Sequence, residues 1–148
     1  MNGKMSCRTE RKMMNIYVGN LPYSTNNEEL AGIFAKLGHT DQIVIADCGL
    51  PIPDGTVCID LAYKLGEPGF IPVLEEVLED LEVEQVFIAE EMKESNPDLN
   101  NYVQECFNDI QKVTHEQFKI QTKAAKVIIR TGEASPYANI ILQSGVIF

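Results

Sequence analysis

Short apolar runs alternate with amphipathic stretches along most of the chain. Apolar runs of four to eight residues, bounded by glycine, proline or polar residues, are typical of buried strands. The first such run in the body of the chain is 43–46, and it is followed by a turn-rich loop with four glycines and prolines. The strands predicted in this way are 16–18, 43–46, 57–62, 86–89, 110–114, 127–129 and 140–148.

The stretches between these runs repeat their apolar residues with the period of a helix. Leu30, Ile33, Phe34 and Leu37 follow one another at the spacing i, i+3, i+4, i+7, which predicts an amphipathic helix. Gly38 stands where a glycine commonly ends a helix. Further helices are predicted over 68–81, 97–107 and 115–123.

Strands that alternate with helices predict an α/β domain, in which helices cover a mostly parallel or mixed sheet. Ligands in such folds bind outside the ends of the strands. Several polar residues stand at predicted element boundaries and are therefore candidate site residues. They are His39, Asp47, His115, Tyr137 and Asn139.

The segment before the last predicted strand is unusually rich in groups that form hydrogen bonds. Pro136 fixes the backbone where this segment begins, and the residues after it are expected to be extended. Tyr137 and Asn139 would then point to one face, with Ala138 between them on the other. A phenol and an amide side by side could bind a hydroxylated ligand.

The charge of the chain limits the partners that it could bind. The 148 residues carry a formal net charge of −10. Four of the twelve basic residues lie within the first twelve positions, so residues 13–148 carry 8 basic and 21 acidic residues, a net charge of −13. This disfavours nonspecific binding to nucleic acid or to an anionic membrane, but not to a neutral sugar. No apolar run is long enough to span a membrane, and the start of the chain does not resemble a signal peptide.

The four cysteines are scattered, without a CxxC pair that would indicate a zinc site or a disulfide framework. We therefore expect free thiols and a cytoplasmic protein. No pattern of a hydrolase nucleophile, a metalloenzyme or a phosphate-binding loop is present.

His39 and His115 are the two histidines of the chain, and imidazole can move a proton near neutral pH. Each could equally be a surface or capping residue, and Asp47 could be a turn residue. The adjacent pair Glu90 and Glu91 is expected to be a solvated rim, because neighbouring residues face apart.

Six motifs in order resemble the D-ribose pyranase family over about residues 27–148. They are GHTD at 38–41, VIADCGLPIP at 44–53, IDL at 59–61, AEEMKESNP at 89–97, HEQFK at 115–119 and RTGEASPYAN at 130–139. The resemblance implies a three-layer sandwich, with helices on both sides of the sheet. It also implies an isomerase that interconverts the β-pyranose and β-furanose forms of D-ribose in ribose catabolism.

The resemblance further implies the roles of individual residues. The histidine of the GHTD motif, His39, would be the proton donor, and no cofactor or metal would be needed. The family's assembly would be a homodecamer of two stacked pentamers in the cytoplasm. The substrate-binding residues would be Asp47, His115, Tyr137, Ala138 and Asn139.

The first 26 residues depart from the family and are interpreted as an atypical N-terminal extension to a domain over 27–148. Residues 15–30 instead resemble the start of an RNA-recognition motif, with Tyr17 where such modules stack a base. No later segment resembles the second motif of that module, and the body is acidic, so RNA binding is not expected. The alternatives are a fucose mutarotase-like activity and a non-catalytic sugar-binding or RNA-binding protein.

Overall fold

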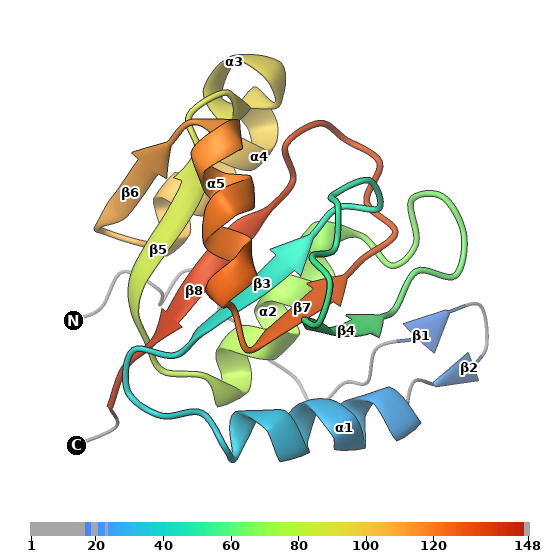
Figure 1. Ribbon diagram of the computed structural model, residues 1–148. Helices are drawn as coiled ribbons and strands as arrows, with labels where there is room; N and C mark the ends of the chain where they lie inside the picture. Colours follow the sequence, from blue (N-terminus) through green and yellow to red (C-terminus); the bar gives the residue numbers. More distant parts are fainter. Residues whose placement is uncertain (1–16, 19–20, 23, 147–148) are drawn as a thin grey trace.

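The fold is built on a six-stranded mixed sheet with the strand order β4-β7-β3-β8-β5-β6 (Figure 1). The computed structural model describes residues 17–18, 21–22 and 24–146. The strands of the sheet are β3 (Gln42–Ala46), β4 (Val57–Asp60), β5 (Val83–Ala89), β6 (Ile110–Val113), β7 (Val127–Arg130) and β8 (Ile140–Ser144).

One strand, β8, runs against all the others. It pairs antiparallel with β3 on one side and with β5 on the other, whereas β4, β7 and β3 are parallel and β5 is parallel to β6. Its residues Ile140, Ile141 and Leu142 are fully buried because the strand lies in the middle of the sheet. The sheet is therefore mostly parallel but mixed.

Apolar side chains project from both faces of the sheet, as the near-continuous apolar runs predict. Ile43 and Ile45 face the core under α1 (Ser24–Phe34), α2 (Phe70–Asp80) and α4 (Pro97–Cys106). Val44 and Ala46 face the opposite core, which α5 (His115–Gln121) covers through Phe118. Figure 1 shows α5 and α2 on opposite faces. The predicted three-layer α/β sandwich is confirmed.

The boundaries differ from the predictions where no strong apolar signal marks them. The strand predicted from 86 begins three residues earlier, at Val83, and the charged stretch after it forms a short helix, α3 (Met92–Ser95), that was not predicted. The helix predicted over 115–123 ends at Gln121 and continues as the 3₁₀ turn Thr122–Ala124. The last strand ends at Ser144, and the final two residues of the predicted span, 147–148, lie outside the described residues.

The prediction that Gly38 ends the first helix is wrong. The helix ends at Phe34, and two tight turns follow, in which the N–H groups of Lys36 and Leu37 donate to the carbonyls of Ile33 and Phe34. Gly38 lacks the positive φ of a helix-ending glycine, and its N–H instead donates to Asp41 Oδ2 at 2.8 Å. Among the cysteines, Cys48 and Cys58 are free, whereas Cys106 is disulfide-bonded, so the expectation of free thiols is wrong there.

The segment that resembles an RNA-recognition motif is separate from the main sheet. Strands β1 (Tyr17–Val18) and β2 (Leu21–Pro22) pair only with each other in a two-stranded antiparallel ribbon. The remaining predicted residue of that strand, at position 16, lies outside the described residues. Among the helices of the described residues, none is both long and apolar enough to cross a membrane.

Gly132 provides a test of how tightly the loop after β7 packs. A methyl group at this position would lie 2.6 Å from the backbone nitrogen and 2.6 Å from the carbonyl carbon of Glu67, so the backbone would have to move. We expect Gly132→Ala to destabilise the fold by about 1–3 kcal/mol. Gly32→Ala is the matched control, because nothing lies within 4 Å of the added methyl in α1. That control should stabilise the fold by about 0.5–1 kcal/mol. Thermal unfolding of both variants, followed by circular dichroism, measures the difference, and equal midpoints would contradict it.

Candidate active site

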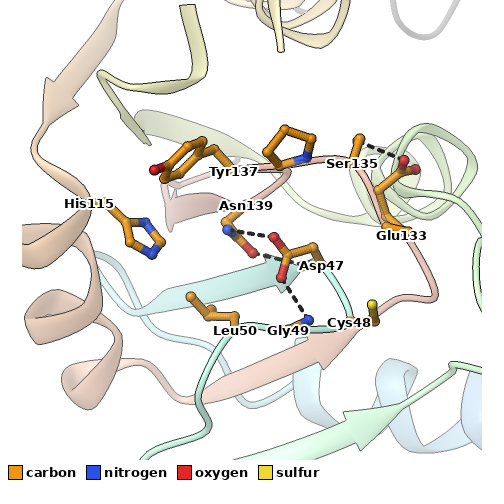
Figure 2. Close-up of a pocket in the computed structure, with 11 residues that line it drawn as sticks. Asp47, Cys48, Gly49, Leu50, His115, Glu133, Ser135, Tyr137 and Asn139 are labelled. Carbon is orange, nitrogen blue, oxygen red and sulfur yellow. Dashed lines mark hydrogen bonds between the residues drawn. The ribbon is translucent and has the colours of Figure 1, made fainter. Parts of the chain in front are cut away.

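The ends of three elements that are far apart in the sequence meet at one edge of the sheet. Asp47 follows β3 directly, Asn139 precedes β8 directly, and His115 opens α5 after β6. Because β8 is antiparallel to β3, with Ile140 opposite Ile45, the start of β8 lies beside the end of β3. These side chains surround a cavity of about 330 Å³ (Figure 2). Its lining comprises Asp47, Cys48, Gly49, Leu50, His115, Glu133, Ala134, Ser135, Pro136, Tyr137 and Asn139.

Asp47 and Asn139 hold each other through two hydrogen bonds. The backbone N–H of Asp47 donates to Asn139 Oδ1 at 2.8 Å, and Asn139 Nδ2 donates to Asp47 Oδ2 at 3.2 Å. The other carboxylate oxygen accepts from the N–H of Gly49 at 2.9 Å. Each oxygen of an ionised carboxylate can accept about two hydrogen bonds, so both retain capacity for ligand hydroxyls. This pair is oriented before any ligand binds.

His115 is held by contacts of both its backbone and its ring. Its backbone N–H donates to Glu91 Oε1 at 2.9 Å and to Oε2 at 3.2 Å. Its ring meets the ring of Tyr137 edge-on, with centroids 5.0 Å apart. Its Nδ1 is buried and has no hydrogen-bond partner among the described residues. Buried polar atoms rarely remain unpaired, so this nitrogen is a position where a buried water molecule would be bound.

Tyr137 does not have the extended backbone that was predicted for it. Its φ is +57°, and its carbonyl accepts from the N–H of Asn139 at 2.8 Å, so the chain turns here before β8 begins. The prediction that this segment is extended is therefore wrong. Tyr137 and Asn139 nevertheless both line the cavity. Ala138 is fully buried in the core, so only its backbone can serve a ligand.

Three polar residues hold the loop that carries Tyr137. Asn96 Nδ2 donates to Ser135 Oγ and to the carbonyl of Pro136, each at 2.9 Å. Ser135 Oγ donates to Glu133 Oε2 at 2.8 Å, and Glu133 Oε1 accepts from the N–H of Phe70 at the start of α2, also at 2.8 Å. A non-glycine residue with positive φ persists where its surroundings determine the backbone in this way.

Several supporting residues were not predicted. Glu91 is the partner of His115 and not part of a solvated rim, because its carboxylate turns to the start of α5. Arg130 donates to the carbonyl of Cys48 at 2.8 Å and to Asp60 at 2.6 Å, and so fixes the loop after Asp47. Both lie within motifs quoted above, but nothing in their spacing reveals their partners.

His39 lies outside this cavity. It precedes β3, whereas Asp47 follows the same strand, so within one copy of the chain the two residues lie at opposite edges of the sheet. The side chain of His39 is 53% exposed, and its Nε2 lies 2.9 Å from Glu84 Oε2. The structure thus brings together all of the predicted substrate-binding residues and leaves the predicted proton donor apart.

The turn that carries His39 is nevertheless tightly held. Thr40 has a φ of +74°, which is rare for a β-branched residue. Its N–H donates to the carbonyl of Ser144 at 2.9 Å, and the N–H of Ser144 donates to the carbonyl of Asp41 at 2.8 Å. The hydrogen bond from His39, and then that from Gln143, lowers the pKa of the Glu84 carboxyl below its usual value. In the described part of the chain, no three acidic, histidine or cysteine side chains lie close enough to hold a metal ion.

Curated relatives cover most of this chain. It is 54% identical over 124 residues to a D-ribose pyranase of Bacillus cereus (strain B4264), covering 82% of this chain and 95% of the relative. It is 56% identical over 122 residues to D-ribose pyranases of Halalkalibacterium halodurans and Staphylococcus haemolyticus, again covering 82% of this chain and 95% of each relative.

Solved structures match the fold as well. The structure of Bacillus subtilis RbsD complexed with D-ribose matches with a TM-score of 0.80 and 45% identity, covering 93% of this chain and 99% of that one. The fucose mutarotase of Streptococcus pneumoniae in complex with L-fucose matches with a TM-score of 0.63 and 24% identity, covering 81% and 93%, a likeness of fold alone.

The model of one family, described as the RbsD / FucU transport protein family, matches residues 24–147. That span contains the whole six-stranded sheet and every residue of the cavity. The chain therefore belongs to the RbsD / FucU transport protein family.

Proposed function

We propose that this protein is an isomerase that interconverts the β-pyranose and β-furanose forms of D-ribose. The observation that carries the proposal is the hydrogen-bonded pair of Asp47 and Asn139 in one cavity with His115 and Tyr137. These groups offer a carboxylate, an amide, an imidazole and a phenol, which suit a ligand with several hydroxyls. The relatives that are 54–56% identical carry the name D-ribose pyranase.

The reaction needs proton transfers and little else. Opening the pyranose ring requires a proton on the ring oxygen and the removal of one from the anomeric hydroxyl, which gives the open-chain aldehyde. A different hydroxyl of the chain then attacks the carbonyl carbon, and the reverse proton transfers close the furanose ring. A well-placed acid–base group contributes roughly 10²–10⁴-fold to such a reaction.

The cavity residues would bind and orient the sugar. Asp47 accepts hydrogen bonds from hydroxyls, the imidazole of His115 offers a further hydrogen-bonding group, and Tyr137 covers one side. The backbone of Ala138 and the amide of Asn139 complete the set. Orientation matters because reclosure selects one hydroxyl of a flexible open chain.

We assign the acid–base role to His39 of a neighbouring copy of the chain. Within one copy His39 is too far around the sheet to reach the cavity, and its ring is largely exposed to solvent. A homo-oligomer, proposed to be a decamer of two pentamers, would place His39 of one copy at the cavity of the next. Closed symmetric assemblies bury such shared sites between identical subunits.

The setting of this activity is also a proposal. Imported ribose is mostly pyranose, whereas the kinase that follows uses furanose, so the protein would act in ribose catabolism in the cytoplasm. Residues 1–26 are proposed to be an extension to the domain over 27–148, which is supported by the start of the family match at residue 24. No cofactor is proposed.

A fucose mutarotase-like activity is the main alternative, and ribose is favoured by the much higher identity to ribose pyranases. A non-catalytic sugar-binding protein would use the same cavity. An RNA-binding role has only the short β1–β2 ribbon in its favour.

Exchange NMR on ribose and on fucose tests the function directly. We expect the protein to accelerate exchange between the pyranose and furanose forms of ribose, because its cavity orients the open chain. His39→Ala should lose roughly 10²–10⁴-fold of that acceleration while ribose still binds. Absence of any acceleration by the unaltered protein would refute the proposal, and full activity of His39→Ala would remove His39 as the acid.

Mixed oligomers test whether two copies share each site. His39→Ala and Asp47→Asn should each be inactive alone. When the two variants are co-expressed and assemble at random, about one quarter of the sites should combine an intact cavity with an intact His39 from a neighbour. Ribose exchange at about that fraction of the unaltered rate is the expected result. If both residues act within one copy, every site carries one defect and no activity returns.

A further inference from the structure

Glu84 occupies an unusual position in the sheet beside His39. The pairing of β5 with β8 shifts between Val83, which lies opposite Ser144, and Gln85, which lies opposite Gln143. Glu84 falls between these two pairs as the extra residue of a β-bulge. Bulges occur next to active sites, where they redirect a side chain. Here the redirected carboxylate meets the imidazole of His39 at 2.9 Å.

The fold makes room for this carboxylate. Gly145 packs against Glu84, and a methyl group at Gly145 would lie 3.1 Å from Glu84 Cβ. The N–H of Gly145 donates to the carbonyl of Glu82 at 2.8 Å, which keeps the two segments close. The absence of a side chain at position 145 therefore permits the bulge to sit against β8.

A directed chain of hydrogen bonds leads to the same carboxylate. Gln42 Nε2 donates to Gln143 Oε1 at 2.9 Å, and Gln143 Nε2 donates to Glu84 Oε1 at 3.1 Å. An ionised carboxylate only accepts hydrogen bonds, so the amide group of Gln143 must turn its nitrogen towards Glu84. The second oxygen, Oε2, is left for His39.

The same rule decides where His39 carries its hydrogen. Oε2 can accept but cannot donate, so Nε2 of His39 must be the donor. In the neutral ring Nδ1 then carries no hydrogen. Glutamate is ionised near neutral pH at its usual pKa, and the hydrogen bond from His39 lowers the pKa of Glu84 further.

Stability alone does not account for the arrangement. The side chains of His39 and Glu84 are 53% and 36% exposed, and exposed ion pairs contribute little to stability. A bulge, a glycine and two glutamines nevertheless converge on this pair. Their combined effect is to fix the ring orientation and the tautomer of one histidine.

We infer that Glu84 is a positioning residue for the ring-opening reaction, which holds His39 in the Nε2–H tautomer so that Nδ1 is the atom that exchanges a proton with the sugar. This inference rests on the proposed function. In the protonated imidazole, Nδ1 gives its proton to the sugar ring oxygen as the bond from that oxygen to the anomeric carbon breaks, and the anomeric hydroxyl releases its proton to water as the carbonyl forms. The ring that remains is neutral, with its hydrogen on Nε2 still donated to Glu84. In reclosure the attacking hydroxyl gives its proton to Nδ1, and the carbonyl oxygen takes a proton from water.

Glu84→Gln tests the inference with little change in shape. The amide that replaces the carboxylate would have one acceptor oxygen and one donor NH₂ group in place of two acceptor oxygens. Because Gln143 donates to the acceptor, the NH₂ group of this amide would face His39 Nε2 and favour the Nδ1–H tautomer. Glu94→Gln is the matched control, because it removes the same charge from an exposed residue of α3, beyond the opposite end of β5.

Long-range ¹H–¹⁵N correlation spectra report the tautomer directly. The chain has two histidines, so the spectrum of His39→Ala assigns the signals of His39 and His115. We expect the Nε2–H pattern for neutral His39 in the unaltered protein and in Glu94→Gln, and a shift towards Nδ1–H in Glu84→Gln. A predominant Nδ1–H form in the unaltered protein would overturn the inference.

Ribose exchange rates provide the second measurement. Glu84→Gln should lower the maximal exchange rate by about tenfold to a hundredfold, less than the loss of the whole imidazole. The ribose concentration at half-saturation should stay within about twofold, because Glu84 does not contact the sugar. An unchanged maximal rate would overturn the role of Glu84. If the unaltered protein fails to accelerate ribose exchange, the proposed function falls, while the spectra still decide the tautomer.

Discussion

The antiparallel insertion of β8 between β3 and β5 is the constraint on which the rest of the structure depends. This strand joins the β4-β7-β3 half of the sheet to the β5-β6 half, and no other described strand pairs with both. Because it runs against its neighbours, its first residues meet the last residues of β3. The pairing of Asn139 with Asp47 follows from that direction. At the other end, Ser144 binds the turn that carries His39. One strand therefore positions both the cavity and the predicted proton donor.

The periodicity of the sequence predicted the main strands and helices because burial on one or both faces leaves a local pattern. It could not predict the direction of β8, because an apolar run carries no information on whether the strand is parallel or antiparallel to its neighbours. The turn at Tyr137, with its positive φ, was missed because the loop before it is held by hydrogen bonds from Asn96 to Ser135 and to the Pro136 carbonyl. Asn96 is distant in the sequence, and Ser135 belongs to no apolar pattern. The short helix at Met92–Ser95 was hidden within a charged stretch.

The candidate site residues were found through the family resemblance, and their geometry came from the fold. Asp47, His115, Tyr137 and Asn139 line one cavity, whereas His39 lies beyond the other end of β3. The order of residues along the chain does not reveal this separation, because only seven residues lie between His39 and Asp47. The five-residue strand β3 lies between them and places its two ends at opposite edges of the sheet.

The position of β8 also has a consequence for synthesis. The ribosome makes a chain from its N-terminus, and β8 follows all the other described strands in the sequence. Until residues 140–144 emerge, β3 and β5 have no strand between them, and Asn139 cannot reach Asp47. The nascent chain would expose the unpaired edges of both strands during that interval. A polypeptide of this topology thus acquires its cavity in one late step, when its two half-sheets pair with β8 between them.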